Sequence, residues 1–290
     1  MSALRVVFPQ WQGGETNNIC SYCPELERSD ATTGYVLGSQ LLNFLAPKTD
    51  KQITIPVEMN VDDVATENGI FARQVLLRQH KKAIEMINEA NPVRIVTLGG
   101  ECSVSVVPFK YLINKHPDDY AVVWIDAHPD MGEPGDAYTG YHAMALALVC
   151  GKGDKEFIEA APGVADPKRA IIVGLRPDPN NPAIPRSEGY GLRSISVEAY
   201  RQDKESVIKF LESIKAKHVV IHLDLDVIDP TDLIAAVGKD PNGLFTKEVI
   251  EIINGIHEKF DIVGLTVAEH MPSVELRIRN LLMQLPHIGK

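Results

Sequence analysis

The sequence predicts an α/β fold, a three-layer α/β/α arrangement around a central, mostly parallel sheet. Short runs of β-branched and aliphatic residues alternate with longer stretches of helical spacing along the whole chain. Alternation of this kind pairs successive strands in parallel and covers both faces of the sheet with helices. No linker-like, repeated or low-complexity tract interrupts the alternation, so residues 1–290 are predicted to form one domain.

The elements follow one another in a regular order. The predicted strands cover residues 4–8, 53–56, 93–98, 121–125, 170–175, 218–223 and 261–267. The predicted helices cover residues 34–45, 68–88, 103–115, 141–149, 203–215, 246–257 and 273–285. The segment 177–185 is rich in Pro and Asn and is predicted to be a surface loop. In a fold of this class, ligands bind where the carboxyl ends of the strands run into loops.

The charge balance narrows the classes of partner. The chain has 29 basic and 39 acidic residues, a formal net charge of −10 at pH 7. This balance disfavours nucleic acid and anionic membrane surfaces, and it favours a small cationic substrate.

Cysteine use and the absence of targeting features predict a cytoplasmic location. Cysteines occur only at positions 20, 23, 102 and 150, which is too few and too uneven for a disulfide framework. The first residues run directly into a strand without signal-peptide features, and no apolar run reaches the ~18 residues of a membrane span. Cys20 and Cys23 lack a second Cys or His pair at zinc spacing, so we expect a loop feature there.

Two segments place potential metal ligands at strand ends. Asp126, His128 and Asp130 follow the strand at 121–125, and Asp224 and Asp226 follow the strand at 218–223. Alternate spacing directs the members of each segment to one side. A single Asp after a strand usually caps a turn, but a group of buried carboxylates repels itself and requires a cation. The two segments therefore predict a divalent-metal site that activates water.

A third segment, Gly99-Gly100-Glu101-Cys102-Ser103, ends another strand and enters a helix. Together with Asp-Ala-His-Pro-Asp at 126–130 and Asp-Leu-Asp-Val-Ile-Asp-Pro at 224–230, it resembles the ureohydrolase family of arginases, agmatinases, guanidinobutyrases and formimidoylglutamases. The resemblance spans nearly the whole chain. It implies an arginase-like sheet of about eight strands and a homo-oligomer, either a trimer or a hexamer.

The resemblance also implies a pair of metal ions, which in the family are manganese. Matching the motifs residue by residue, Asp126 and Asp224 would bridge the two ions. Asp130 would complete the first site, and His128 with Asp226 would complete the second.

The first segment departs from the family pattern. The family usually reads Gly-Gly-Asp-His-Ser, whereas this chain has Glu101 and Cys102 in place of Asp and His. A Cys102 thiolate ligand would add a negative charge and favour zinc, iron or cobalt over manganese at the first site. Alternatively, Cys102 stays a neutral buried thiol and the first site binds metal weakly or is vacant.

Two further positions match residues that the family uses in chemistry. His142 matches the histidine that transfers a proton, which suits a group that titrates near neutrality. Glu269 matches the glutamate that holds the guanidinium, and a carboxylate pairs well with that planar fork of donors. Considered alone, an isolated His after an aromatic residue is more often a packed or surface side chain, and a Glu at a strand end is commonly solvated.

Candidate substrate contacts rest on shorter signals. Trp11, in a tight turn after the first strand, either borders a pocket or packs against its own turn, and Asp178 either contacts a substrate amine or is a plain loop residue. The loop 131–141 contains no Asn or Ser, whereas arginase uses these residues to grip the amino-acid end of its substrate, so arginine is not the expected substrate. Asp229 precedes Pro230 and is expected to form a turn.

The resulting functional prediction is a metal-dependent hydrolase that cleaves a carbon–nitrogen bond of a guanidino or amidino compound by metal-activated hydroxide. His142 and Glu269 are its expected catalytic residues. The alternative, motivated by Cys102, is a catalytically impaired relative that binds a ligand or serves as a structural subunit. Deacetylation of an amine by the same fold is disfavoured by Asp130 and Glu269, which suit two metals and a guanidinium.

Overall fold

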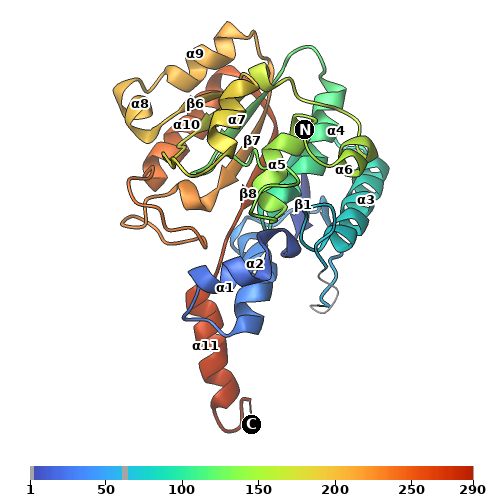
Figure 1. Cartoon of the computed structure of the whole chain (residues 1–290), viewed down its shortest axis with the longest axis vertical. Coiled ribbons are helices and arrows are strands. Elements are labelled where there is room, and N and C mark those ends of the chain that lie inside the picture. The colour runs from blue at the N-terminus through green and yellow to red at the C-terminus, as the bar shows by residue number, and fades with distance from the viewer. Residues whose placement is uncertain (1–2, 61–64, 290) are drawn as a thin grey trace.

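A central sheet organises the computed structural model, which describes residues 3–60 and 65–289 (Figure 1). The sheet has 8 strands in the order β2-β1-β3-β8-β7-β4-β5-β6, and every neighbouring pair is parallel. The strands are β1 (Leu4–Phe8), β2 (Gln52–Thr54), β3 (Ile95–Gly99), β4 (Tyr120–Ile125), β5 (Ala170–Val173), β6 (Arg193–Ile195), β7 (His218–Asp224) and β8 (Asp261–Ala268). The predicted fold class is confirmed. The strand β6 was not predicted, because its three residues include the polar pair Arg193 and Ser194.

Helices connect the strands. They are α1 (Thr16–Tyr22), α2 (Arg28–Leu45), α3 (Arg73–Ala90), α4 (Val106–Lys115), α5 (Ala145–Val149), α6 (Lys155–Ala160), α7 (Ala183–Gly189), α8 (Val197–Gln202), α9 (Ser206–Ser213), α10 (Thr246–Lys259) and α11 (Ser273–Gln284). Each predicted helical stretch overlaps one of these helices, although α2 begins at Arg28, before the predicted start at residue 34. The helices α1, α6, α7 and α8 were not predicted, because segments of six or seven residues carry too little periodicity. The expected loop at 177–185 is therefore wrong at its end, where α7 begins.

Both faces of the sheet are covered, which β4 shows most directly. All of its residues are buried, and successive side chains point to opposite faces. Tyr120, Val122 and Trp124 pack into a core with residues of α3, α4, α5 and α6. Ala121, Val123 and Ile125 pack into a second core with residues of α8, α9 and α10. The three-layer arrangement follows from this alternation.

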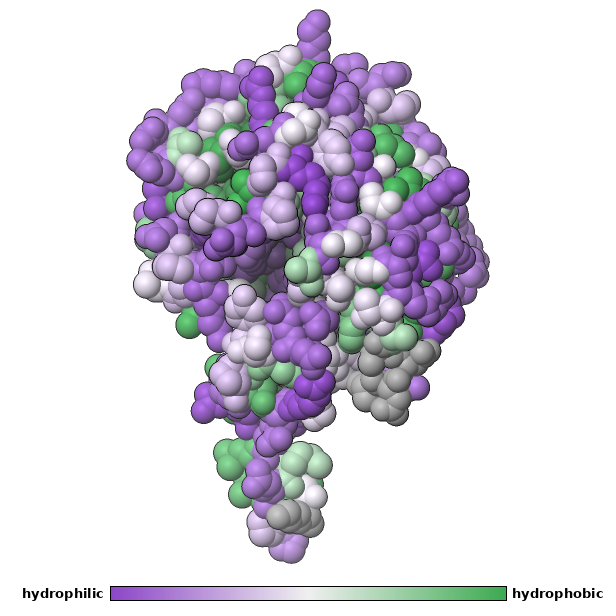
Figure 2. Space-filling model, in the orientation of Figure 1, coloured by the Kyte–Doolittle hydropathy of each residue, from purple (hydrophilic) through white to green (hydrophobic). Residues whose placement is uncertain are grey.

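A smaller apolar cluster joins α1, α2 and α11 around Tyr35 and Met271. From there α11 extends away from the body of the molecule (Figure 1). The face shown in Figure 2 is largely hydrophilic, and the projecting C-terminal part carries exposed apolar side chains, among them Ile278 and Leu281. Within the residues that the structure describes, no helix has both the length and the apolar character needed to cross a membrane.

Candidate metal centre

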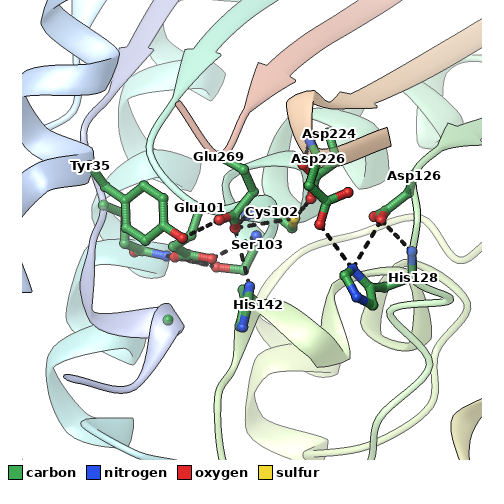
Figure 3. Close-up of polar contacts among 12 residues, drawn as sticks. Tyr35, Glu101, Cys102, Ser103, Asp126, His128, His142, Asp224, Asp226 and Glu269 are labelled. Carbon is green, nitrogen blue, oxygen red and sulfur yellow. Dashed lines mark hydrogen bonds and ion pairs between the residues drawn. The ribbon is translucent and has the colours of Figure 1, made fainter. Parts of the chain in front are cut away.

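Four adjacent strands bring the predicted ligands together. In the sheet, β3, β8, β7 and β4 are consecutive neighbours, and their carboxyl ends meet at one edge because all pairs are parallel. The residues at these ends are Cys102 after β3, Glu269 after β8, Asp224 and Asp226 at the end of β7, and Asp126, His128 and Asp130 after β4. Figure 3 shows that side chains from these segments, far apart in the sequence, point toward a common region.

One group of candidate ligands, at the predicted second metal site, surrounds His128. Its Nδ1 atom lies 2.9 Å from Oδ2 of Asp226 and 3.7 Å from Oδ1 of Asp126. One ligand atom of each of these residues lies within 4.8 Å of the others. The imidazole is 45% exposed, whereas the two carboxylates are nearly inaccessible. Asp240 approaches the far side of the ring, with Oδ2 3.5 Å from Nε2, and no motif in the sequence predicts this contact.

The other group, at the predicted first metal site, lies deeper, around Cys102. Its thiol donates to Oδ2 of Asp224 at 3.1 Å, and it is 1% exposed. Atoms of Cys102, Asp126, Asp130 and His222 all lie within 4.8 Å of one another, and all four residues are buried. His222, within β7, was not predicted to be part of the site.

The backbone at Asp130 is held in an unusual conformation. Its φ angle is 47°, in the left-handed region that non-glycine residues rarely occupy. Its Oδ2 atom is buried and has no hydrogen-bond partner among the described residues. Strain and an unpaired oxygen at one residue are typical of functional sites, where a ligand completes the arrangement.

The electrostatics of the two groups call for a cation. Burial raises the pKa of Asp126 and of Asp224 well above the ordinary value, and neighbouring carboxylates raise it further. Burial likewise raises the pKa of Asp130 to about 7, and burial followed by nearby carboxylates raises the pKa of the Cys102 thiol. The carboxylate, imidazole and sulfur atoms of these residues are ligands that divalent metal ions use, and some of them are buried without a hydrogen-bond partner among the described residues. The metal-ligand roles of the individual residues stay a prediction.

Glu269 occupies the wall of the centre next to Cys102. Its backbone has a φ of 68°, and its N–H donates to the carbonyl of Gly100 at 2.7 Å. Its Oε1 accepts from the N–H of Cys102 at 3.0 Å and lies 3.1 Å from Nδ1 of His142, while its Oε2 accepts from the hydroxyl of Tyr35. The carboxylate is therefore fixed from three sides. Tyr35, on α2, belongs to no recognisable motif and was not predicted.

His142 links Glu269 to a second tyrosine. Its Nε2 atom lies 2.7 Å from the hydroxyl of Tyr138, which donates to the carbonyl of Gly14 at 2.9 Å. Burial lowers the pKa of the imidazole, but the neighbouring Tyr138 oxygen and the Glu269 carboxylate outweigh burial and raise it well above its ordinary value. The ring remains 22% exposed, so it can exchange a proton with water.

Glu101, which replaces the usual aspartate, turns away from the metal groups. Its carboxylate accepts from Gln10 at 2.6 Å and from the backbone and hydroxyl of Ser103, both at 2.8 Å. A Cβ atom at Gly13 would lie only 2.4 Å from this carboxylate, so glycine at position 13 leaves room for the longer side chain. Burial raises the pKa of Glu101 to about 7.

The remaining predicted residues lie apart from the metal groups. Trp11 is 1% exposed and donates its indole N–H to the carbonyl of Glu58 at 3.0 Å, and its role as a substrate contact stays a prediction. Asp178 is exposed and accepts from the N–H of Asn180, and its substrate role stays a prediction. Asp229 accepts from the N–H groups of Thr231 and Gly243, which confirms its turn role.

The cysteine pair differs from the expectation in part. Cys20 lies within α1 and Cys23 directly follows it, so the expected loop is wrong. Both thiols are free, as are Cys102 and Cys150.

The chain is similar to arginases and their relatives in sequence and fold. The family model described as the arginase family matches residues 39–282. An arginase of Staphylococcus aureus is 24% identical over 191 residues, which cover 62% of this chain and 61% of that arginase. The chain thus spans about three fifths of the length of that curated relative.

Solved structures extend the similarity over nearly the whole fold. The arginase of Entamoeba histolytica in complex with L-ornithine aligns with a TM-score of 0.74 at 18% identity and covers 94% of this chain and 92% of its own. The proclavaminate amidino hydrolase of Streptomyces clavuligerus aligns with a TM-score of 0.64 at 16% identity, covering 93% and 79% of the two chains. The family match over most of the sequence, on this fold, shows that the chain belongs to the arginase family.

Proposed function

We propose that the protein is a metal-dependent hydrolase that cleaves a carbon–nitrogen bond of a guanidino or amidino compound. The observation that carries the proposal is the convergence of the ends of β3, β8, β7 and β4, where buried carboxylates meet a Glu269–His142 pair. Membership of the arginase family supports the class of reaction.

Two groups of residues would hold divalent ions, manganese by resemblance to the family. One ion would lie among Asp126, His128, Asp224 and Asp226, and the other among Cys102, Asp126, Asp130 and Asp224. Bound there, the ions would lower the pKa of water and stabilise the negative charge that develops as the substrate carbon becomes tetrahedral. The thiol at Cys102 leaves zinc, iron or cobalt as candidates for the first ion, or a first site that is vacant.

Glu269 would orient the substrate. Its carboxylate has a fixed direction, because Tyr35 holds Oε2 while the backbone of Cys102 holds Oε1. A carboxylate offers about four lone-pair positions, and Oε2 accepts from Tyr35 alone among the described residues, so this oxygen keeps a position for an N–H group of a guanidinium. A cationic group also compensates the negative charge of the surrounding acids, and an amine-bearing substrate suits the net charge of −10.

His142 would move the proton. Its two ring nitrogens connect Glu269 on one side with Tyr138 on the other, and the ring touches solvent. When the carbon–nitrogen bond breaks, the leaving amine must gain a proton, and a protonated imidazole within the site can supply it. An unsubstituted guanidine substrate would then release urea.

The chemistry of the loop 131–141 bears on which substrate is used. Arginine carries an α-carboxylate and an α-amino group, and the loop has neither Asn nor Ser to bind them. Guanidines without the amino-acid end, such as agmatine or guanidinobutyrate, are therefore preferred over arginine.

The same proposal includes a cytoplasmic location and a homo-oligomer, a trimer or hexamer by resemblance to the family. The four free cysteines suit a reducing compartment.

The decisive experiment combines elemental analysis of the purified protein with a urea-release screen over arginine, agmatine, guanidinobutyrate and hydroxylated guanidines. We expect about two metals per chain after reconstitution, and turnover that is lost in Asp126→Asn. Less than one metal per chain, with no turnover after reconstitution with manganese, zinc, iron or cobalt, would support the alternative of an impaired relative that binds a ligand.

A further inference from the structure

His222 is a buried histidine inside the central strand β7. It is fully inaccessible to solvent, and it lies opposite Trp124 of β4 in the strand register. The two rings are stacked, with centroids 3.8 Å apart and planes 15° apart. Trp124 also donates its indole N–H to Oδ2 of Asp126 at 2.9 Å, so one side chain fixes both His222 and a predicted metal ligand.

The two ring nitrogens of His222 have different surroundings. Nδ1 lies 2.8 Å from the hydroxyl of Ser105, which fixes the rotation of the ring. Nε2 is buried and has no hydrogen-bond partner within the described parts of the chain, and the nearest carboxylate oxygen, Oδ2 of Asp126, is 4.0 Å away. Leaving such a nitrogen unpaired costs about 1–3 kcal/mol, and a ligand bound there would remove that cost.

The unpaired nitrogen points into the deeper metal group. Nearby, Oδ2 of Asp130 is also buried without a partner among the described residues. One donor atom each of Cys102, Asp126, Asp130 and His222 lies within 4.8 Å of the others, a spacing that a single ion can bridge with small side-chain movements. Simple packing against Trp124 explains the stacking of His222 but leaves both unpaired atoms unexplained.

We propose that His222 supplies an imidazole ligand to the first metal ion, replacing the imidazole that the chain lacks at Cys102. The inference rests on the proposed metal-dependent function and adds a ligand to it. The first site then consists of the Cys102 sulfur, the carboxylates of Asp126, Asp130 and Asp224, and Nε2 of His222. The imidazole enters from the strand β7 instead of from the loop after β3.

Ser105 has a defined part in this arrangement. A metal-bound histidine usually donates its other N–H to a neighbouring acceptor, which fixes the tautomer that exposes the ligand nitrogen. With the metal on Nε2, the ring proton lies on Nδ1 and is donated to the Ser105 hydroxyl, 2.8 Å away. A donor set that combines a sulfur and an imidazole with the carboxylates favours zinc, iron or cobalt over manganese.

The test counts the imidazoles at the metal centre without relying on activity. The chelator-stripped full-length protein is loaded with Cu(II) or Mn(II), and pulsed EPR measures the nitrogen couplings of coordinated imidazoles. We expect two kinds of imidazole nitrogen, from His128 and His222, in the unmutated protein. Calorimetric titration with Co(II) should show two sites per chain, of which His222→Phe weakens one by about 100-fold and Ser105→Ala weakens the same one by about tenfold.

A matched control comes from His80. This histidine is also buried with an unpaired Nε2, but it packs against Phe157, away from the carboxylates. His80→Phe should change neither the nitrogen couplings nor the Co(II) affinities.

The outcomes separate this inference from the proposed function. Two bound metals with only one coordinated imidazole, or two Co(II) affinities unchanged in a folded His222→Phe variant, would overturn the role of His222 and leave the proposed function standing. A protein that binds no divalent metal would overturn both. Where His222→Phe does not fold, a single coordinated imidazole in the unmutated protein still overturns the role of His222. If two are found, His142→Asn must leave both couplings in place, because His142 also lies near Cys102 and its loss would otherwise explain the second one.

Discussion

The hydroxyl of Tyr35, on α2, donates a hydrogen bond to Oε2 of Glu269, which follows β8 and lies 234 positions later in the chain. Both side chains are buried. If Glu269 orients the substrate, Tyr35→Phe should lower kcat/KM about tenfold, because the carboxylate loses one of the groups that fix its direction. Steady-state urea release measures the effect. Tyr111→Phe removes another buried hydroxyl, far from Glu269, and should leave kcat/KM unchanged; equal losses in both variants would assign Tyr35 a purely structural role.

His142→Asn should lower kcat about 100-fold or more while the KM changes little, since the variant keeps a polar side chain but loses the group that transfers the proton. Its control is His270→Asn. His270 follows Glu269 in the sequence, but its Nδ1 atom forms a hydrogen bond with the carbonyl of Ala235 and not with Glu269 or His142. A kcat that stays within about twofold of the unmutated enzyme would exclude His142 as the acid–base group.

Cys102→His should raise the affinity for Mn(II) about tenfold or more, because it exchanges a sulfur for the harder imidazole donor at a metal position. Calorimetric titration of the chelator-stripped protein provides the measurement, and Cys150→Ala, which changes a buried thiol elsewhere, is the control. An unchanged affinity would count against the placement of Cys102 beside the first metal.

Removal of the metals should destabilise the fold. Buried Asp126, Asp130 and Asp224 lie close together, and without a cation their charges repel one another. Adding Mn(II) at about 100 times its dissociation constant should raise the free energy of unfolding by about 3 kcal/mol relative to the stripped protein. Urea unfolding followed by circular dichroism tests this, and a free energy of unfolding independent of metal would rule out a site formed only in the folded state.

Glu248 should make stability depend on pH in the acid range. Hydrogen bonds from Arg201, at 3.0 and 2.8 Å, lower the pKa of this carboxyl to about 2. The folded-state pKa lies below the unfolded one, so the stabilisation is complete above about pH 4.5 and is lost as the pH falls toward 2. Glu248→Gln should therefore cost about 2 kcal/mol of unfolding free energy at pH 7 and less at pH 3. Urea unfolding at both pH values measures the difference, and an equal cost at both would contradict the ionic contribution.

The sequence predicted the sheet better than the connecting segments, for physical reasons. Buried strands such as β4 are continuous apolar runs, and their ends are marked by polar residues that only a ligand site explains. The short helices α6 and α8 have one or two buried side chains each, too few to set a period. The Pro and Asn residues at 177–185 favoured the prediction of a loop. The helix α7 nevertheless begins within this segment, because Pro185 lies in its first turn, where proline is tolerated.

The site was predictable where ligands occur in a motif and not where they depend on tertiary packing. Asp126, Asp130 and Asp224 follow strands in recognisable segments, and the structure brings them together. Tyr35 lies on an amphipathic helix, and only the fold places it against Glu269. His222 could have been suspected, because a polar residue two positions before Asp224 shares its face of the strand.

The strand order has a consequence for how the protein is made. The strand β8, near the end of the chain, lies between β3 and β7 and pairs with both. Until residues 261–268 leave the ribosome, the growing chain can form only two partial sheets, β2-β1-β3 and β7-β4-β5-β6, each with an open edge. Closing this gap requires contacts of long sequence separation, which form slowly. The nascent protein therefore forms the candidate metal centre last, in the same step that pairs the two open edges through which it would otherwise aggregate.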